Sequence, residues 1–288
     1  MDVQKSGDEA VVVVDTNSWV ATNKKGFVPP VCNKCMFSDF LKVFFVGGPN
    51  SRDDYHIEEG EELFYQIKGD MVLKVIEDGV PKDVRIKEGQ VFLLPARVQH
   101  SPQRFEGTLG CVVERERKQD EFDCVRYFVK GKPIPTPLWE RWFHLNDVVK
   151  DLPPVIKEFN ESQEKFTNTP GDSSFTTKAA FKPSKVELVE PITLSKFINE
   201  NIDKINASSV VLFKEQSTST STVLLGKGEH NLDSGNTELL LLFERGQGTL
   251  KYGSEEFTVP TFNTVRIKPN SKATLTITDG ICLTFKFT

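Results

Sequence analysis

The chain has 288 residues, of which 38% are hydrophobic and 27% charged, so it can bury a core and is long enough for two domains. Its net charge of −5 and pI of about 5.6 argue against partners such as nucleic acid or an anionic membrane. No apolar run approaches the ~20 residues that span a bilayer. The short run at 11–14 has no basic segment before it and no cleavage site, so we expect an early strand there rather than a signal peptide.

Five cysteines, an odd number and sparsely placed, argue against a secreted disulfide framework. Cys32 and Cys35 have the spacing of a redox or zinc half-site, but the second Cys-x-x-Cys pair of a zinc ribbon is missing. Two reduced thiols are the favoured interpretation, and the cytosol is the expected compartment.

The first part of the chain predicts short strands separated by turn signals. The strand at 41–46 stops at the breaker Gly47-Gly48-Pro49-Asn50, and Gly69 marks a hairpin turn. The further predicted strands are 62–67, 71–76, 84–86, 91–94, 110–114 and 126–129. Strands this short and evenly spaced favour a sandwich or small barrel over βαβ units.

The middle of the chain has a different composition. Residues 139–145 and 154–159 look partly helical, residues 160–183 are rich in Ser, Thr, Asn, Lys and Pro, and 194–202 predict a short helix. From about residue 210 the strand pattern returns. Aligning Gly246 with Gly69 matches the two halves element by element, which indicates an internal repeat of one β-barrel unit. We expect a metal-binding domain at 1–160, a linker at 161–185 and a degenerate domain at 186–288.

Three candidate metal ligands lie at fixed distances from these turns. Glu62 begins the strand that ends near Gly69, His56 precedes it, and His100 follows the strand that Pro95 ends. Two imidazoles and one carboxylate on one face are typical of iron(II) sites that keep positions open for substrate and oxygen. Burying three such groups without a metal would be costly. We therefore expect His56, Glu62 and His100 to bind one divalent metal ion.

Each of the three residues has an ordinary alternative when taken alone. His56 could be a surface or capping histidine, Glu62 lies in an acidic stretch typical of a solvated loop, and His100 could be a hydrogen-bonded structural residue. The joint spacing, with Gly69, Gly89 and Pro95 in register, favours the metal site.

This spacing resembles the two cupin motifs, with a Gly turn closing the first and Gly-x5-Pro opening the second. The resemblance implies an all-β-dominated fold of two cupin-type (jelly-roll) β-barrels in one chain, with short helices and a linker between them. The common cupin pattern has a second His two residues after the first, where this chain has Glu58. The metal would then have three protein ligands instead of four, and Glu58 is expected to face solvent or to hydrogen-bond a ligand.

Longer segments are similar to the 3-hydroxyanthranilate 3,4-dioxygenase family. The resemblance is dense from Trp19 to Tyr127 and is carried by residues 29–34, 46–62, 92–104 and 112–115. The second barrel makes the chain similar to the long animal-type form, and it has no equivalent of the C-terminal cysteine-based iron site of bacterial members. The resemblance implies one Fe(II) per chain at His56, Glu62 and His100, which would be the catalytic residues.

The resemblance also implies a reaction and a set of substrate contacts. The ring of 3-hydroxyanthranilate would be opened by O2 to 2-amino-3-carboxymuconate semialdehyde, which cyclises to quinolinate for NAD biosynthesis in the kynurenine pathway. A substrate carboxylate calls for a guanidinium, and Arg52 and Arg104 each lie four residues from a histidine. Glu114 would accept from the substrate amine, and Asn33 and Glu62 would complete the substrate site.

Other interpretations remain open. Arg52 and Arg104 could be surface charges, and Glu114 could belong to an exposed ion-pair ladder over residues 114–117. The chain could be another metal-dependent cupin oxygenase acting on a small acid, or a metal-binding scaffold without turnover. In the second barrel the positions aligned with the triad are Asp233, Leu239 and Thr274, and His230 is out of register. We expect that barrel to bind no metal and to act as an internal dimer partner in a monomer.

Overall fold

The computed structural model describes residues 3–27 and 32–288. The chain forms two units: a middle unit, Phe27–Thr193, and a terminal unit, which joins Met1–Gly26 to Leu194–Thr288. Within the described residues, no helix is long and apolar enough to cross a membrane. Residues 29–31 of the 29–34 motif that carries the family resemblance lie outside the described residues.

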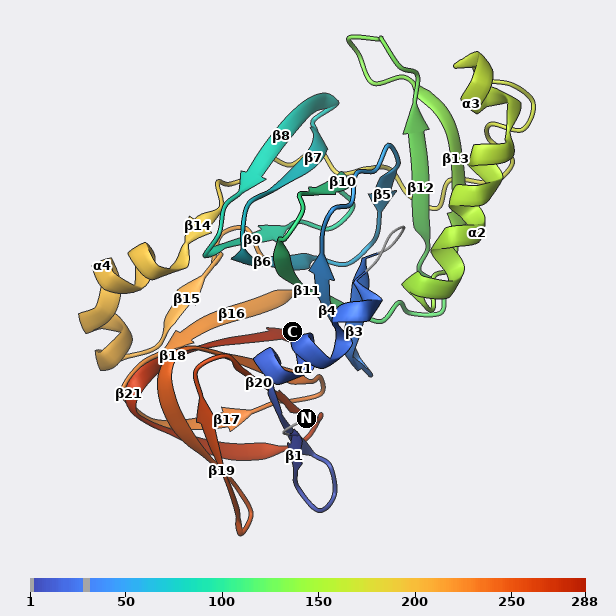
Figure 1. The fold of residues 1–288 in the computed structure, drawn as a ribbon. Coiled ribbons are helices and arrows are strands. Elements are labelled where there is room, and N and C mark those ends of the chain that lie inside the picture. The colour runs from blue at the N-terminus through green and yellow to red at the C-terminus, as the bar shows by residue number, and fades with distance from the viewer. Residues whose placement is uncertain (1–2, 28–31) are drawn as a thin grey trace. The chain divides into compact units, whose positions relative to one another are not determined.

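The middle unit is built from two six-stranded antiparallel sheets (Figure 1). One sheet has the order β14 (Ile192–Thr193), β9 (Gln90–Leu94), β6 (Glu62–Lys68), β11 (Leu109–Arg115), β4 (Leu41–Gly47) and β3 (Asn33–Ser38). The other has the order β13 (Pro137–Phe143), β12 (Asp123–Phe128), β5 (Tyr55–Ile57), β10 (Gln99–Arg104), β7 (Met71–Glu77) and β8 (Val80–Ile86). One apolar cluster draws Phe64 from the first sheet and Leu73 and Val75 from the second, as expected for two sheets packed as a sandwich.

The predicted turn at Gly69 joins β6 to β7. Gly69 has φ +65°, and a Cβ there would lie 2.9 Å from the Thr108 side chain, so both backbone conformation and space require glycine. The turn lets the chain leave one sheet and enter the other.

Residues 139–145 are not helical, contrary to the sequence expectation. They fall largely within strand β13, which pairs with β12 from Asp123↔Phe143 to Phe128↔Pro137. The aromatic residues that resembled a helical stripe are instead buried strand residues, with Trp139 fully buried and Trp142 5% exposed. The predicted helix at 154–159 lies inside α2 (Val148–Glu161), which is followed by α3 (Gln163–Thr167).

The segment expected to be a linker, 161–185, packs on the middle unit. The Glu140 N–H donates to the Ser174 carbonyl at 2.9 Å, and the Trp142 N–H donates to Thr177 Oγ1 at 2.8 Å. The Phe181 ring lies edge-on to Trp142 with centroids 4.8 Å apart. The polar composition of segment 161–185 fits these hydrogen bonds to the edge strand β13. Without them, backbone groups of β13 would stay unpaired.

The terminal unit is a nine-stranded antiparallel sheet. Its main path is β1 (Val3–Lys5), β2 (Val11–Asp15), β20 (Asn263–Ile267), β18 (Leu239–Tyr252), β21 (Lys272–Phe287), β16 (Thr220–Leu225) and β15 (Val210–Leu212). Off this path, β17 (Gly228–Asp233) pairs with β21 and β19 (Glu255–Pro260) pairs with β18. The helices are α1 (Thr16–Asn23), the 3-10 helix η1 (Lys24–Gly26) and α4 (Leu194–Ala207), the last covering the predicted 194–202.

The structure divides the chain differently from the expected 1–160, 161–185 and 186–288. Strand β2 pairs with β20 along its whole length, from Val11↔Ile267 to Asp15↔Asn263. Val11 and Val13 belong to the apolar core of the terminal unit. Residues 1–26 therefore belong with the C-terminal part of the chain, because their apolar face is buried there.

The internal repeat is visible in the strand pairing. Strand β9 pairs with β6 beginning at Glu62↔Leu94, and β20 pairs with β18 beginning at Leu239↔Ile267. Gly246, aligned with Gly69, has φ +73° but lies inside the long strand β18, between two register shifts in its pairing with β21, rather than in a turn. Both units thus use a left-handed glycine at the same place in the repeat.

Candidate metal centre

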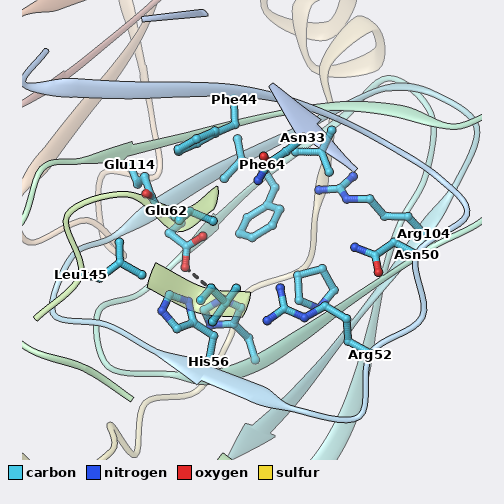
Figure 2. Close-up of a pocket in the computed structure, with 16 residues that line it drawn as sticks. Asn33, Phe44, Asn50, Arg52, His56, Glu62, Phe64, Arg104, Glu114 and Leu145 are labelled. Atoms are coloured by element: carbon cyan, nitrogen blue, oxygen red, sulfur yellow. Dashed lines mark ion pairs between the residues drawn. The ribbon is translucent and has the colours of Figure 1, made fainter. Parts of the chain in front are cut away.

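His56, Glu62 and His100 meet between the two sheets of the middle unit. His56 on β5 and His100 on β10 are directly paired residues of neighbouring strands, and Glu62 begins β6 on the facing sheet. Each residue offers one ligand atom within 4.8 Å of the others. His100 Nε2 lies 3.1 Å from Glu62 Oε1 (Figure 2).

Each imidazole is held through one of its two nitrogens. His100 Nδ1 contacts the Val98 carbonyl oxygen at 3.0 Å, so it carries the proton and Nε2 is free to face Glu62. His56 Nε2 contacts Asp123 Oδ2 at 2.7 Å. Burial lowers the pKa of His100, which favours the neutral imidazole that a metal needs.

Glu62 remains ionised although it is only 5% exposed. Burial alone would raise its pKa, but His100 and a hydrogen bond from Glu58 hold the pKa below its ordinary value. Glu62 Oε1 has no hydrogen-bond partner. A buried carboxylate oxygen without a hydrogen-bond donor, beside two imidazoles, fits a divalent cation, which would satisfy that oxygen.

Behind the ligands, Arg117 binds three buried carboxylates. Its Nη2 lies 2.5 Å from Glu58 Oε2 and 2.8 Å from Asp123 Oδ2, and its Nη1 lies 3.0 Å from Glu114 Oε1. The expectation that Glu58 faces solvent is wrong, since Glu58 is 2% exposed. Its pairing with Arg117 explains why an acidic run that resembles a solvated loop turns inward.

Several buried carboxylates surround the candidate ligands. The carboxylates of Glu58, Glu62, Glu114 and Asp123 are each at most 5% exposed. Arg117 pairs with three of them, and Glu62 pairs with His100 instead. Burial raises the pKa of Glu58 well above its ordinary value, and Arg117 opposes that rise. A divalent ion at His56, Glu62 and His100 would lower the repulsion among these carboxylates.

The ligands face a small cavity of about 90 Å³. Its lining residues are Asn33, Phe44, Val46, Asn50, Arg52, His56, Glu62, Phe64, His100, Pro102, Arg104, Val112, Glu114, Leu145, Val148 and Leu152. Figure 2 shows Arg52 and Arg104 on one side of the cavity and Glu114 on the other. The cavity therefore has a cationic side and an anionic side, with the metal ligands next to both.

The two cavity arginines differ in their partners. Arg52 makes a bidentate ion pair with Asp54, through Nε to Oδ1 at 3.0 Å and through Nη2 to Oδ2. Arg104 is 5% exposed, and its Nη1 donates to Gln66 Oε1 at 3.3 Å. Burial lowers the pKa of Arg104 to about 10, which still leaves it charged at neutral pH. No carboxylate among the described residues pairs with Arg104, so its charge is available to an anion in the cavity.

Glu114 and Asn33 lie on the same sheet as Glu62. Glu114 and Val112 both line the cavity from β11, and Glu114 is buried rather than part of an exposed ladder. Burial raises its pKa, while Arg117 opposes the shift. Asn33 Oδ1 is buried without a hydrogen-bond partner, so it has a free acceptor for a molecule in the cavity.

Several functional residues of this region were not predicted from the sequence. Asn50 lines the cavity, Asp123 holds His56, and Arg117 binds the carboxylates. Asn50 ends the breaker at residues 47–50, and that position directly before the His56 segment was the available signal. Nothing local in the sequence marks Asp123, because its partner is 67 residues away.

In the terminal unit, strand pairing places Thr274 opposite Asn231 rather than opposite Asp233. Leu239 occupies the position of Glu62. His230 Nε2 lies 2.8 Å from the Gly226 carbonyl oxygen. The two groups of metal-ligand side chains found among the described residues both lie in the middle unit.

All five cysteines are free thiols. Cys32 Sγ donates to the Pro49 carbonyl and Cys35 Sγ to the Phe37 carbonyl. Burial raises the pKa of Cys35 to about 12 and also raises that of Cys32. Both therefore have the protonated, unreactive character of structural thiols.

Comparisons with known proteins show the family to which the chain belongs. The family model of 3-hydroxyanthranilic acid dioxygenase matches residues 9–160. The 3-hydroxyanthranilate 3,4-dioxygenase of Caenorhabditis elegans is 48% identical over 277 residues, covering 96% of this chain and 98% of that protein. The Xenopus tropicalis enzyme of the same name is 41% identical, covering 85% of this chain and 86% of that protein. A salicylate 1,2-dioxygenase structure from Pseudaminobacter salicylatoxidans has a TM-score of 0.60 at 9% identity, covering 95% of this chain and 82% of that one, which shows a shared cupin fold alone.

Proposed function

The chain belongs to the 3-hydroxyanthranilic acid dioxygenase family and is a ring-cleaving dioxygenase, and we propose that it opens the ring of 3-hydroxyanthranilate with iron(II) and O2. Both oxygen atoms would enter across the ring bond beside the hydroxyl, giving 2-amino-3-carboxymuconate semialdehyde. This product cyclises with loss of water to quinolinate, an NAD precursor of the kynurenine pathway.

The observation that carries the proposal is the placement of two histidines and one glutamate between the cationic and anionic sides of one cavity. His56, Glu62 and His100 would hold one Fe(II) per chain. The iron would supply Lewis acidity and a template that holds substrate and oxygen together.

The remaining cavity residues match the substrate's polar groups. Arg104, supported by Arg52 and Asn50, would bind the carboxylate through charged hydrogen bonds. Glu114 would accept from the amine, which lies next to the carboxylate on the ring, and Asn33 would supply a further acceptor. Phe44 and Phe64 give the ring an apolar surface and exclude water from it.

We further propose that the protein works in the cytosol as a monomer, because its second barrel could replace the partner that a single-barrel relative needs. Sedimentation of the purified full chain tests the monomer, and a stable dimer at micromolar concentration would contradict it.

The test of function is aerobic turnover after anaerobic loading with Fe(II). We expect ring opening of 3-hydroxyanthranilate, followed by absorbance, with one O2 consumed per substrate. Anthranilate, which lacks the hydroxyl, and 3-hydroxybenzoate, which lacks the amine, should turn over poorly. Iron-loaded protein that leaves 3-hydroxyanthranilate unchanged would sink the proposal. Equal turnover of the analogues would favour a general oxygenase of small acids.

A further inference from the structure

The guanidinium of Arg117 is surrounded by acceptors. The Nε and Nη2 groups form a fork onto the two oxygens of Asp123 at 2.9 and 2.8 Å. Nη1 donates to the Arg115 carbonyl at 3.0 Å. Two further carboxylates form ion pairs with the same guanidinium: Glu58 Oε2 lies 2.5 Å from Nη2, and Glu114 Oε1 lies 3.0 Å from Nη1. The side chain is only 4% exposed, so these bonds do not compete with solvent.

Each carboxylate bound by Arg117 leads to a different part of the candidate site. Asp123 contacts His56 Nε2 at 2.7 Å. Glu58 and Glu62 each offer a carboxylate oxygen within 4.8 Å of the other. Glu114 lines the cavity itself. One side chain outside the cavity thus touches the supports of two metal ligands and one cavity carboxylate.

We propose that Arg117 is a positioning residue that fixes the orientation of His56 through Asp123 and the orientation of Glu114 directly. Three carboxylates this close repel one another, and in a buried setting they would rotate apart or take up protons without the guanidinium between them. The Asp123 carboxylate can hold the His56 ring only while its own plane is fixed by the Arg117 fork. The part of this inference that concerns the substrate amine rests on the proposed function, whereas the part that concerns His56 does not.

Lysine cannot replace this arginine. An ammonium has three donors on one atom, so it cannot form a planar fork on Asp123 and also reach Glu58 and Glu114. Removal of a group that orients a metal-bound histidine typically lowers metal affinity 10- to 100-fold. We expect Arg117→Lys to weaken metal binding by roughly that factor.

The main experiment measures Co(II) binding to metal-free protein by visible absorption, without substrate, so its result does not depend on the reaction. Arg117→Lys and Asp123→Asn should each raise the Kd for Co(II) roughly 10- to 100-fold. The double variant should be no worse than the weaker-binding single variant, because both changes interrupt one chain of contacts. Parent-like Co(II) affinity in folded Arg117→Lys, or fully additive effects, would overturn the proposal.

Arg141→Lys is the matched control. Arg141 is as buried as Arg117, with a side chain 7% exposed, and its donors are also occupied, but by Glu158 and the carbonyls of Glu140, Ser173 and Ser174. None of these acceptors contacts a metal ligand, so Arg141→Lys should keep the parent Kd for Co(II). A rise equal to that of Arg117→Lys would show a general packing effect and overturn the assignment.

Two further measurements keep the proposal falsifiable. If Arg117→Lys does not fold, Asp123→Asn alone must weaken Co(II) binding while circular dichroism stays unchanged, and unchanged affinity refutes the proposal.

Binding of 3-hydroxyanthranilate to Co(II)-saturated protein tests the second arm of the proposal, the orientation of Glu114. Arg117→Lys and Glu114→Gln should each weaken it, and parent-like substrate affinity in Arg117→Lys refutes that arm. If the parent itself does not bind 3-hydroxyanthranilate, the proposed function fails while the Co(II) result still decides the role of Arg117.

Discussion

Among single residues, Arg104 is the most unusual, because its buried guanidinium has no carboxylate partner in the described part of the chain. Burying an unpaired charge lowers the free energy of unfolding, and an anion bound in the cavity would offset that cost. The guanidinium of Arg52, in contrast, already forms an ion pair with Asp54. We infer that Arg104 supplies most of the binding energy for a carboxylate and that Arg52 shapes the adjoining wall.

Arg104→Ala should therefore raise KM for 3-hydroxyanthranilate about 10- to 100-fold, the loss expected for a hydrogen bond to a charged group. The Kd for Co(II) should not change, because Arg104 contacts no ligand. The melting temperature should not fall much in Arg104→Met, since that variant removes an uncompensated buried charge. Arg97→Ala is the control, because Arg97 is 46% exposed and pairs with Glu59. An unchanged KM in Arg104→Ala would remove Arg104 from the site.

The candidate ligands could be predicted from the sequence because of their spacing from turn residues. His56, Glu62 and His100 stand at recognisable distances from Gly69, Gly89 and Pro95, so their meeting in space could be predicted. Glu58 and Arg117 could not, because each lies in a charged run that is typical of solvent-exposed loops. Their burial depends on a pairing between residues 59 positions apart, which no local pattern encodes.

At the scale of elements, the sequence predicts the short strands and the turn glycines, but it does not predict which strands pair with each other. β13 shows the limit: its tryptophans are compatible with a buried helix or a buried strand, and pairing with β12 decides between them. β2 shows it again, because four consecutive valines predict a strand without saying which sheet receives it. Its partner, β20, lies about 250 residues later in the chain.

Val13→Ala tests that placement. Val13 is 1% exposed in the core of the terminal unit, and the lost methyl groups together with the cavity should cost about 2 kcal/mol. The variant should destabilise the terminal unit while leaving the Kd for Co(II) at the parent value. Val211→Ala is the control, since Val211 is 47% exposed in β15 of the same unit. If Val13→Ala weakened Co(II) binding instead, residues 1–26 would belong with the metal-binding domain, as the sequence had indicated.

For the whole molecule, the two units share one repeat but differ in what their interiors contain. In the middle unit the space between the sheets holds titratable groups and a cavity. In the terminal unit the corresponding interior is filled by an apolar cluster that includes Leu239, Leu241 and Leu275. The alignment of the two halves places Leu239 at the position of Glu62. The stability of the terminal unit should therefore not depend on a metal ion.

Metal addition should therefore stabilise one unit only. At a Co(II) concentration 100 times the Kd, linkage adds about 2.7 kcal/mol to the middle unit, and for a domain of this size that corresponds to roughly 5–11 °C in melting temperature. Calorimetry with and without Co(II) should show this shift in the parent and in His230→Ala, and no shift in His100→Ala. The alignment and the strand register leave no triad among the described residues of the terminal unit, and the second group of the middle unit, Glu58, Glu62 and Glu114, shares Glu62 with the first. Titration should therefore saturate at one ion per chain. A shift that survives in His100→Ala, or a second equivalent lost in His230→Ala, would place a metal in the terminal unit and reverse this division of roles.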